Sequence, residues 1–476
     1  MKTLVIAEKP SVARDIARVL GCAKKENGAL EGNQYIVTWA LGHLVTLKDP
    51  EDYDKKYKEW NMAVLPMMPE KLQIKVIPQT GKQYHAVTTQ LARKDVGEVV
   101  IATDAGREGE LVARWILDKA HNQKPCKRLW ISSVTDKAIR EGFASLKDAK
   151  EYDNLYRAAV SRAEADWLVG INATRALTCK YNAQLSCGRV QTPTLAMIAQ
   201  REQEIREFVP KPYYTVTAAA GGAVYTWKDE KSGGTRISDP EKAKQIAEKA
   251  KRYPLVLQKV EKKKKQKEAP LLYDLTELQR DASARFGYSA KQTLNLMQSL
   301  YETHKVLTYP RTDSRYLTKD IVPTLKERLD AVSIGPYKTL AQQAKRRPLK
   351  EKPGFVNDAK VSDHHAIIPT EQYVQLSALS NEERRIYDLV VRRFLAVLLP
   401  PCVYEETVIQ ASIEKECFTA RGKRMVEKGW QEAYEDNRYD DEDEAKEEVR
   451  EQNLPLLQAG LSLIHISEPT RLALIS

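Results

Sequence analysis

The chain has 476 residues, of which 42% are hydrophobic and 30% charged, which is enough apolar material for several domains with their own cores. Its formal net charge of +11 indicates a polyanionic partner such as a nucleic acid, although a basic solvated surface alone gives the same count. The sequence opens on a predicted strand, contains no membrane-length apolar stretch and has six scattered cysteines without a C-x-x-C pair. We therefore expect a cytoplasmic protein with no signal peptide, membrane span, zinc ribbon or disulfide framework.

Within residues 1–150, short apolar strands alternate with amphipathic helices. This alternation predicts a parallel-sheet α/β domain. The expected strands are Thr3–Ala7, Tyr35–Ala40, Val99–Thr103 and Arg128–Ile131, and the expected helices are Ser11–Leu20, Tyr84–Lys94 and Glu110–Ala120.

The remainder of the chain changes character several times. Residues 151–207 have a helical pattern, which Pro210 and Pro212 then end, and residues 271–395 are helical again. The expected strands are Tyr213–Thr217, Ala223–Trp227, Val403–Ala411 and Cys417–Ala420. The lysine run at 262–265 is expected to be a charged connector, and the acidic residues 435–451 an exposed helix or a poorly ordered segment.

Two acidic clusters follow apolar strands at points where a helical pattern begins. Glu8 and Lys9 come directly after the first predicted strand, and Asp104 after the third, with Glu108 four residues further on. Carboxylates at the carboxyl end of buried strands are well placed to hold Mg²⁺, and a lysine there is suited to neutralise a phosphate or protonate a leaving oxygen. The alternatives are an ordinary helix start and a surface turn with local ion pairs. Together the clusters favour metal-assisted phosphoryl chemistry.

Two later segments carry reactive side chains. Tyr309 has a hydroxyl that is able to attack phosphorus, and Arg311, two residues away, is suited to hold a phosphate with two hydrogen bonds. The alternative for the tyrosine is an ordinary turn around Pro310. His364 and His365 stand in a predicted loop, and further ligands for a zinc site are not evident.

Three segments are candidates for nucleic-acid contact. The loop 185–193 offers small residues, hydroxyls and an arginine before a helix, so its backbone N–H groups are suited to phosphates. The helix 162–175 carries polar groups and Trp167, and Trp60 is a second aromatic candidate. Either tryptophan is suited to stack on an unpaired base, and core packing is the equal alternative.

In this order, the segments resemble the type IA DNA topoisomerases over nearly all of residues 1–460. The matching stretches are AEKPS at 7–11, ATDAGREGE at 102–110, SRAEADWLVGINATRA at 161–176, LSCGRVQTPTL at 185–195, LTYPRTDS at 307–314 and DHHAIIPT at 363–370. Each stretch alone is a weak signal, whereas six in family order are very specific.

The resemblance implies a multi-domain α/β and α+β fold, in which an N-terminal Toprim parallel-sheet domain joins helical and β-arch domains in a toroid around DNA. The implied parts are a Toprim domain at 1–150, a helical strand-binding domain at 151–210 and 430–460, a β-rich arch at 211–270 and 396–429, and a helical domain bearing Tyr309 at 271–395. The segment from Leu461 to the end looks like a translated sequencing adapter. We expect residues 461–476 to be a non-native tail on a truncated chain.

The resemblance also implies the reaction: ATP-independent cleavage of one DNA strand through a 5′-phosphotyrosine, strand passage and religation. Tyr309 would be the nucleophile, Glu8 the first-strand acid, Lys9 the general acid and Arg311 the phosphate ligand, with His364 or His365 beside the nucleophile. The residues implied to line the single strand are Trp60, Trp167, Arg175, Ser186, Cys187, Gly188, Arg189, Val190 and Gln191.

The cofactor implied is Mg²⁺, held by Glu8, Asp104 and Glu108. The family pattern is usually Asp-x-Asp-x-Glu, and here Gly106 stands at the second acidic position. One ion held by Glu8 and Asp104 is therefore a safer expectation than two ions.

The implied partners are single-stranded DNA and negatively supercoiled or catenated DNA, with a helicase as a candidate protein partner and a monomer as the expected state. The expected location is the bacterial cytoplasm, at the nucleoid. Two other functions stay open. Another Toprim enzyme, such as a primase or nuclease, would share the carboxylates but has no reason to carry LTYPRTDS, and a basic fragment with a dead site would bind single strands without cutting them.

Overall fold

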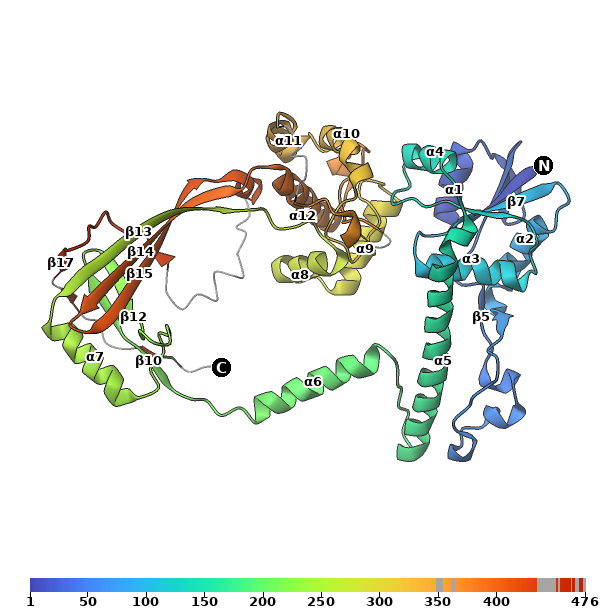
Figure 1. Ribbon diagram of the computed structural model, residues 1–476. Helices are drawn as coiled ribbons and strands as arrows, with labels where there is room; N and C mark the ends of the chain where they lie inside the picture. The colour runs from blue at the N-terminus through green and yellow to red at the C-terminus, as the bar shows by residue number, and fades with distance from the viewer. Residues whose placement is uncertain are drawn as a thin grey trace. The chain divides into compact units, whose positions relative to one another are not determined.

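The computed structural model describes residues 1–347, 354–361, 364–434, 451–452, 454–463, 465–466 and 471–473 (Figure 1). The chain forms two compact units. Unit 1 comprises Met1–Glu202, Leu272–Ala341 and Lys350–Val391, and unit 2 comprises Gln203–Leu271, Gln342–Leu349 and Arg392–Ser476. The four-domain division expected from the sequence stays a prediction.

A seven-stranded sheet organises the N-terminal part of unit 1, and its order is β2-β3-β4-β1-β7-β8-β9. The four central strands are parallel, as expected, and antiparallel strands are added at both edges. The bounds are β1 Lys2–Ala7, β2 Lys24–Glu26, β3 Ala29–Glu31, β4 Tyr35–Trp39, β7 Val96–Ala102, β8 Cys126–Arg128 and β9 Lys147–Asp148. The strand expected at 128–131 was wrong in position, because β8 ends at Arg128.

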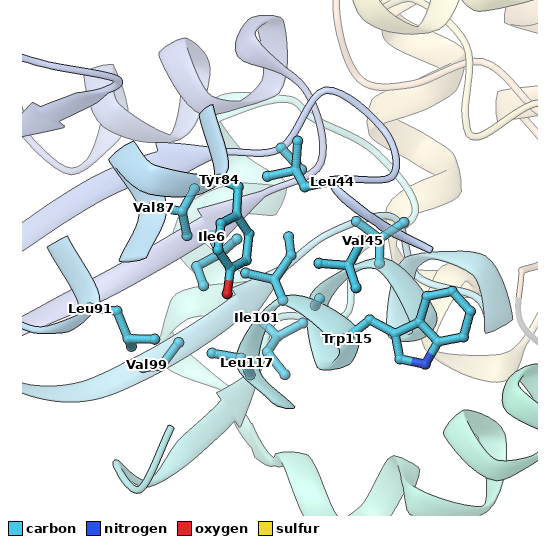
Figure 2. Close-up of a cluster of buried hydrophobic side chains, with 14 of the residues drawn as sticks. Ile6, Leu44, Val45, Tyr84, Val87, Leu91, Val99, Ile101, Trp115 and Leu117 are labelled. Atoms are coloured by element: carbon cyan, nitrogen blue, oxygen red, sulfur yellow. The ribbon is translucent and has the colours of Figure 1, made fainter. Parts of the chain in front are cut away.

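Both faces of this sheet are buried, which explains the continuous apolar runs in β1 and β7. Alternate residues face opposite layers. Leu4, Ile6, Val99 and Ile101 pack in one core cluster, which Figure 2 shows with side chains from the helices α2 and α3 around Ile6 and Ile101. Their neighbours in the sequence pack in a second cluster with α1. The helices are α1 Pro10–Val19, α2 Gly81–Leu91, α3 Arg107–Lys119 and α4 Asp136–Ala144.

The rest of unit 1 is mainly helical. It contains the short pair β5 Val45–Leu47 and β6 Ile74–Val76, and the helices α5 Asp153–Tyr181, α8 Leu275–Phe286, α9 Ala290–Glu302 and α10 Leu325–Ala331. The helices α6 Gln191–Arg206, α11 Lys338–Lys345 and α12 Asn381–Leu398 each run across a boundary between the units. The helical content expected for 151–207 and 271–395 is confirmed.

The segment that carries Tyr309 is extended and is held by backbone pairing. Leu307 pairs with Pro369 in an antiparallel bridge, and the Thr308 N–H donates to the Ile368 carbonyl at 3.0 Å. This pairing brings residues 307–309 alongside the histidine segment, more than fifty positions later in the sequence.

Unit 2 contains an antiparallel sheet whose long strands are β13 Leu255–Lys267, β14 Cys402–Ile413 and β15 Glu416–Glu427 (Figure 1). The shorter elements are β10 Tyr213–Thr215, β11 Thr217–Ala220, β12 Ala223–Trp227, α7 Pro240–Arg252, β16 Glu451–Gln452, β17 Ser462–Leu463, β18 His465–Ile466 and β19 Arg471–Ala473. One end of the long strands encloses a core with α7.

The lysine run at 262–265 is not a connector, so that expectation was wrong. Lys262 to Lys265 lie inside β13 and pair residue by residue with Thr407 to Tyr404 of β14. The run lacks apolar alternation, but its backbone continues a ladder that begins in the unit 2 core.

The C-terminal expectations are only partly covered by the described residues. Within 430–460, a 3₁₀ helix at Gly429–Tyr434 is followed by residues 435–450, which lie outside the described residues and include nearly all of the acidic segment. The non-native character of 461–476 stays a prediction. None of the described helices is long and apolar enough to span a membrane.

A buried ion pair fixes the end of β7. Arg128 and Glu110 are both fully buried, with Nε and Oε1 2.5 Å apart. Arg128 also donates to the carbonyls of Thr103 at 2.7 Å and Asp104 at 2.6 Å. The guanidinium therefore holds the backbone from which Asp104 projects.

Replacing Glu110 by glutamine leaves the Arg128 charge buried without its anionic partner. We expect the free energy of unfolding around β7 to fall by about 3–5 kcal/mol. Native-state hydrogen exchange of the β1 and β7 amides measures this change. The control is Glu98→Gln, which removes a partly exposed pair with Lys127 and costs less than about 1 kcal/mol. Equal protection in both variants would contradict a structural role for the buried pair.

Candidate active site

Two carboxylates meet at one edge of the central sheet. Ala7 at the end of β1 pairs in register with Ala102 at the end of β7. The residues that follow therefore leave the sheet side by side, and the Asp104 N–H donates to Glu8 Oε2 at 3.0 Å. Burial, reinforced by the charge of Asp104, raises the pKa of Glu8 to about 7. Burial also raises the pKa of Asp104.

Lys9 places a positive charge at the same edge. Its Nζ lies 2.8 Å from Glu302 Oε1 and 4.0 Å from Asp104 Oδ2. Burial lowers the pKa of Lys9, but Asp104 and Glu302 together outweigh burial, so that the net shift of the pKa is upward. Lys9 is therefore a charged group held between two carboxylates.

Tyr309 points its hydroxyl at this cluster. The hydroxyl donates to Asp104 Oδ2 at 3.3 Å, and the Tyr309 N–H donates to the Ser132 carbonyl at 3.0 Å. The ring meets Tyr301 edge-on, with centroids 5.5 Å apart. Burial, followed by the negative charges of Asp104 and Glu8, raises the pKa of Tyr309 well above its ordinary value. The phenol is therefore protonated and held by an acceptor.

Of the two histidines, His364 is the one that contacts the nucleophile candidate. Its ring stacks on Tyr309 with centroids 4.3 Å apart, and its Nδ1 lies 3.2 Å from Ser132 Oγ. Burial lowers its pKa to about 4, so the ring is neutral at neutral pH. His365 turns its Nδ1 to the Ala366 carbonyl at 2.7 Å, and burial likewise lowers its pKa to about 4.

Arg311 is exposed beside this cluster. Its positive charge lowers the pKa of Tyr309, against the larger effects of burial and the carboxylates. Within the described part of the chain it forms no ion pair, so its guanidinium is open to a phosphate.

Glu108 does not join the carboxylate pair. It lies on the first turn of α3, where Arg162 Nη1 is 2.7 Å from its Oε1 and His43 Nε2 is 3.7 Å from its Oε2. No group of three or more His, Cys, Asp or Glu residues arranged around a metal position occurs in the described residues. The ligand set of Glu8, Asp104 and Glu108 therefore stays a prediction, and only the first two lie together.

Trp167 is not available to stack on a base, so that expectation was wrong. Its ring is buried in the core, and its Nε1 donates to the Lys48 carbonyl at 2.9 Å. Arg175 is also buried, and its guanidinium lies 5.1 Å from the ring of Trp60. Trp60 itself is 50% exposed and keeps a free part of its ring.

The loop between α5 and α6 is exposed, but its polar groups are already engaged. The N–H groups of Cys187 and Gly188 donate to the hydroxyls of Thr174 and Thr192, both at 3.0 Å. Arg189 pairs with Asp166 at 2.7 Å. Ser186, Val190 and Gln191 complete the exposed loop, and Gln191 donates to the Ser186 hydroxyl. Contact of this loop with a DNA strand stays a prediction. It requires the hydrogen bonds within the loop to be replaced by hydrogen bonds to DNA.

Three residues of the site were not expected from the sequence: Ser132, Arg128 and Glu302. Ser132 holds both the Tyr309 backbone and His364, and Arg128 holds the Asp104 backbone. Their partners are far away in the sequence, so local spacing gives no signal for them.

Two family models match this chain, and between them they cover the central sheet and the segment that carries Tyr309. A model of the DNA topoisomerase family matches residues 150–470, and a model of the Toprim domain matches residues 3–134. The chain therefore belongs to the DNA topoisomerase family, which confirms the resemblance noted from its motifs.

The chain is similar in particular to DNA topoisomerase 3 of Bacillus subtilis (strain 168), at 59% identity over 97% of this chain and 63% of the relative. DNA topoisomerase 3 of Bacillus anthracis is also 59% identical, with the same coverage. The chain thus spans less than two thirds of the length of these relatives. Full-length topoisomerase I from Thermotoga maritima has the same fold, with a TM-score of 0.70 and 22% identity over 99% of this chain and 71% of that chain.

Gly106→Asp tests whether this position is a vacated metal ligand. The Gly106 backbone is extended, and a Cβ added there would meet no atom within 4 Å, so the backbone leaves room for a side chain. We expect the Mg²⁺ concentration for half-maximal DNA relaxation to fall by roughly tenfold, because a third carboxylate adds charge to the pair.

Gly106→Asn is the matched control, since it adds nearly the same volume without charge. An unchanged Mg²⁺ requirement in the aspartate variant would show that Gly106 is not a vacated ligand position.

Proposed function

We propose that this chain carries the catalytic part of a type IA DNA topoisomerase, which breaks and rejoins one DNA strand without ATP. The observation that carries the proposal is the contact of 3.3 Å between the Tyr309 hydroxyl and Asp104 Oδ2, beside Glu8 and Lys9. A tyrosine hydroxyl held against strand-end carboxylates is an arrangement for nucleophilic attack on phosphorus.

In the proposed reaction, the Tyr309 oxygen attacks a backbone phosphorus and the bond from phosphorus to the 3′ oxygen breaks. Asp104 accepts the tyrosine proton along the existing hydrogen bond, and Lys9 donates a proton to the leaving 3′ oxygen. Arg311 holds the phosphate through paired hydrogen bonds. The products are a 5′-phosphotyrosine and a free 3′-hydroxyl. Religation is the reverse, and no ATP is needed because one phosphodiester replaces another.

Glu8 and Asp104 fit a divalent cation. Both are half-buried oxygen donors at adjacent strand ends, and burial raises the pKa of each, reinforced for Glu8 by the charge of Asp104. When bound, Mg²⁺ would neutralise phosphate charge and favour the ionised form of both carboxylates. Attack on phosphorus, proton transfer and phosphate binding are assigned to Tyr309, Asp104, Lys9 and Arg311, as described above.

The proposed substrates are single-stranded regions of negatively supercoiled or catenated DNA. We propose a monomer in the bacterial cytoplasm, with a helicase as the candidate partner. A nuclease or primase would use the same carboxylates but would leave Tyr309 without a role, and a binding fragment would retain DNA without cutting it.

A basic surface in unit 2 supports a DNA substrate. We define the lysine ribbon as residues 260–267 of β13, 402–408 of β14 and 421–427 of β15, which together hold eight basic and four acidic residues. Lys262 and Lys264 are exposed and form no ion pair with any described residue. Lysine ammonium groups on a strand suit the phosphates of a duplex.

Tyr309→Phe tests the proposed nucleophile. We expect relaxation of negatively supercoiled plasmid in Mg²⁺ without ATP to fall to background, because the attacking oxygen is removed while the ring still packs on His364. Tyr301→Phe is the control, since it removes a hydroxyl from the adjacent buried ring and should keep at least half of the activity. Relaxation by the Tyr309 variant would contradict the proposal.

Lys262→Gln with Lys264→Gln tests the lysine ribbon. Each lysine that no longer neutralises a phosphate should reduce the slope of log K against log salt by about 0.9, so the double variant should show a slope smaller by up to about two units in duplex binding. Titrations of a labelled duplex at several salt concentrations measure this slope. Lys244→Gln with Arg252→Gln is the control, because it removes the same charge from α7. An equal reduction of the slope in this control would mean that the net charge of the protein, and not the lysine ribbon, determines the salt dependence.

A further inference from the structure

Lys9 is held by a residue from outside the N-terminal sheet domain. Glu302, the last residue of α9, places its Oε1 2.8 Å from Lys9 Nζ, and it also accepts a hydrogen bond from Gln298. Asp104 is further from the ammonium, at 4.0 Å. The hydrogen bond to Glu302 therefore fixes the direction of the Lys9 side chain.

Glu302 belongs to the same stretch of chain as the nucleophile. Tyr309 follows it by seven residues, and Tyr301, next to Glu302, packs edge-on against the Tyr309 ring. Lys9, Glu8 and Asp104 instead follow the carboxyl ends of β1 and β7. Any motion that withdraws Tyr309 from Asp104 together with the end of α9 also removes Glu302 from Lys9.

Without Glu302, the lysine has other anions within reach. Its four-carbon stem is flexible, and an unrestrained ammonium would turn to Asp104 and Glu8. There it would compete with a cation for the carboxylates and with the Tyr309 hydroxyl for Asp104. Glu302 keeps the ammonium to one side of this pair.

We infer that Glu302 is a positioning residue for Lys9, which sets the proton donor in place only while the Tyr309 segment is docked on the sheet. The inference rests on the proposed strand-cleavage function and adds a residue to it. Under this inference, Lys9 is in position to donate its proton only when Tyr309 is in position to attack.

The structure offers a matched control for this inference. Asp15 of α1 pairs with Lys305 at 2.5 Å, three residues after Glu302. This pair joins the same two parts of unit 1, and neither residue forms an ion pair or hydrogen bond with Lys9. Asp15→Asn therefore weakens docking to a similar extent without disturbing the proton donor.

The experiment compares two single-stranded oligonucleotides, one with the natural 3′ oxygen at the scissile bond and one with sulfur in its place. A thiolate leaves without a proton, so its departure does not need Lys9. Covalent complex formation is followed in single turnover with the wild-type chain, Glu302→Gln, Glu302→Asp and Asp15→Asn.

We expect Glu302→Gln to slow cleavage of the oxygen substrate about tenfold or more, as part of the contribution of a positioned acid. Cleavage of the sulfur substrate should stay within about twofold, Glu302→Asp should recover part of the rate, and Asp15→Asn should resemble wild type on both substrates.

Equal slowing of both substrates, or an equal effect of Asp15→Asn, would overturn the inference in favour of a docking contact. An unchanged rate in Glu302→Gln would overturn it outright. A wild-type chain that forms no covalent complex with either substrate would instead overturn the proposed function, so the two failures are distinguishable.

Discussion

The in-register pairing of β1 and β7 is the constraint on which the site depends. Because both strands are parallel and end at the same edge, Glu8 and Asp104 leave the sheet together. Two half-buried carboxylates this close together are unfavourable unless cations or donors compensate them. Lys9, the Tyr309 hydroxyl and the charge of Arg128 each supply part of that compensation. The groups proposed for the chemistry therefore also stabilise the segment that follows β7.

The contacts from residues 302–371 complete a site that the N-terminal sheet cannot make alone. Tyr309 is held through Ser132 and Asp104, and Glu302 reaches Lys9. Each of these bonds joins a residue on the sheet side to one on the helical side of unit 1. In the proposed function, the nucleophile, its acceptor and the proton donor are thus assembled by docking, so that a strand is broken only where it is able to be rejoined.

Much of this arrangement follows from the sequence, because its signals are local or topological. The strand ends at Glu8 and Asp104 were recognisable from apolar runs followed by helical patterns, and parallel strands bring such ends together. The motif around Tyr309 added the nucleophile. The direction of Glu108 was not predictable, since it depends on how α3 is rotated and on Arg162, 54 positions away.

Other features depend on distant pairing. Trp167 lies on α5, whose residues do not separate into an apolar and a polar face. Its burial therefore depends on which other parts of the chain pack against the helix. The lysine run became a strand because β14 pairs with it, some 140 residues later. Glu302 meets Lys9 across 293 positions, which no spacing rule covers.

The covalent intermediate is the most direct test of the central claim. The chain is mixed with a 3′-labelled single-stranded oligonucleotide, the reaction is stopped with SDS, and the label is sought on the protein by gel electrophoresis. The account predicts labelled protein, because a 5′-phosphotyrosine retains the fragment that carries the 3′ end. Labelled free fragments without labelled protein would indicate metal-dependent hydrolysis, and bound but uncut DNA would indicate a binding fragment; either result would contradict the account.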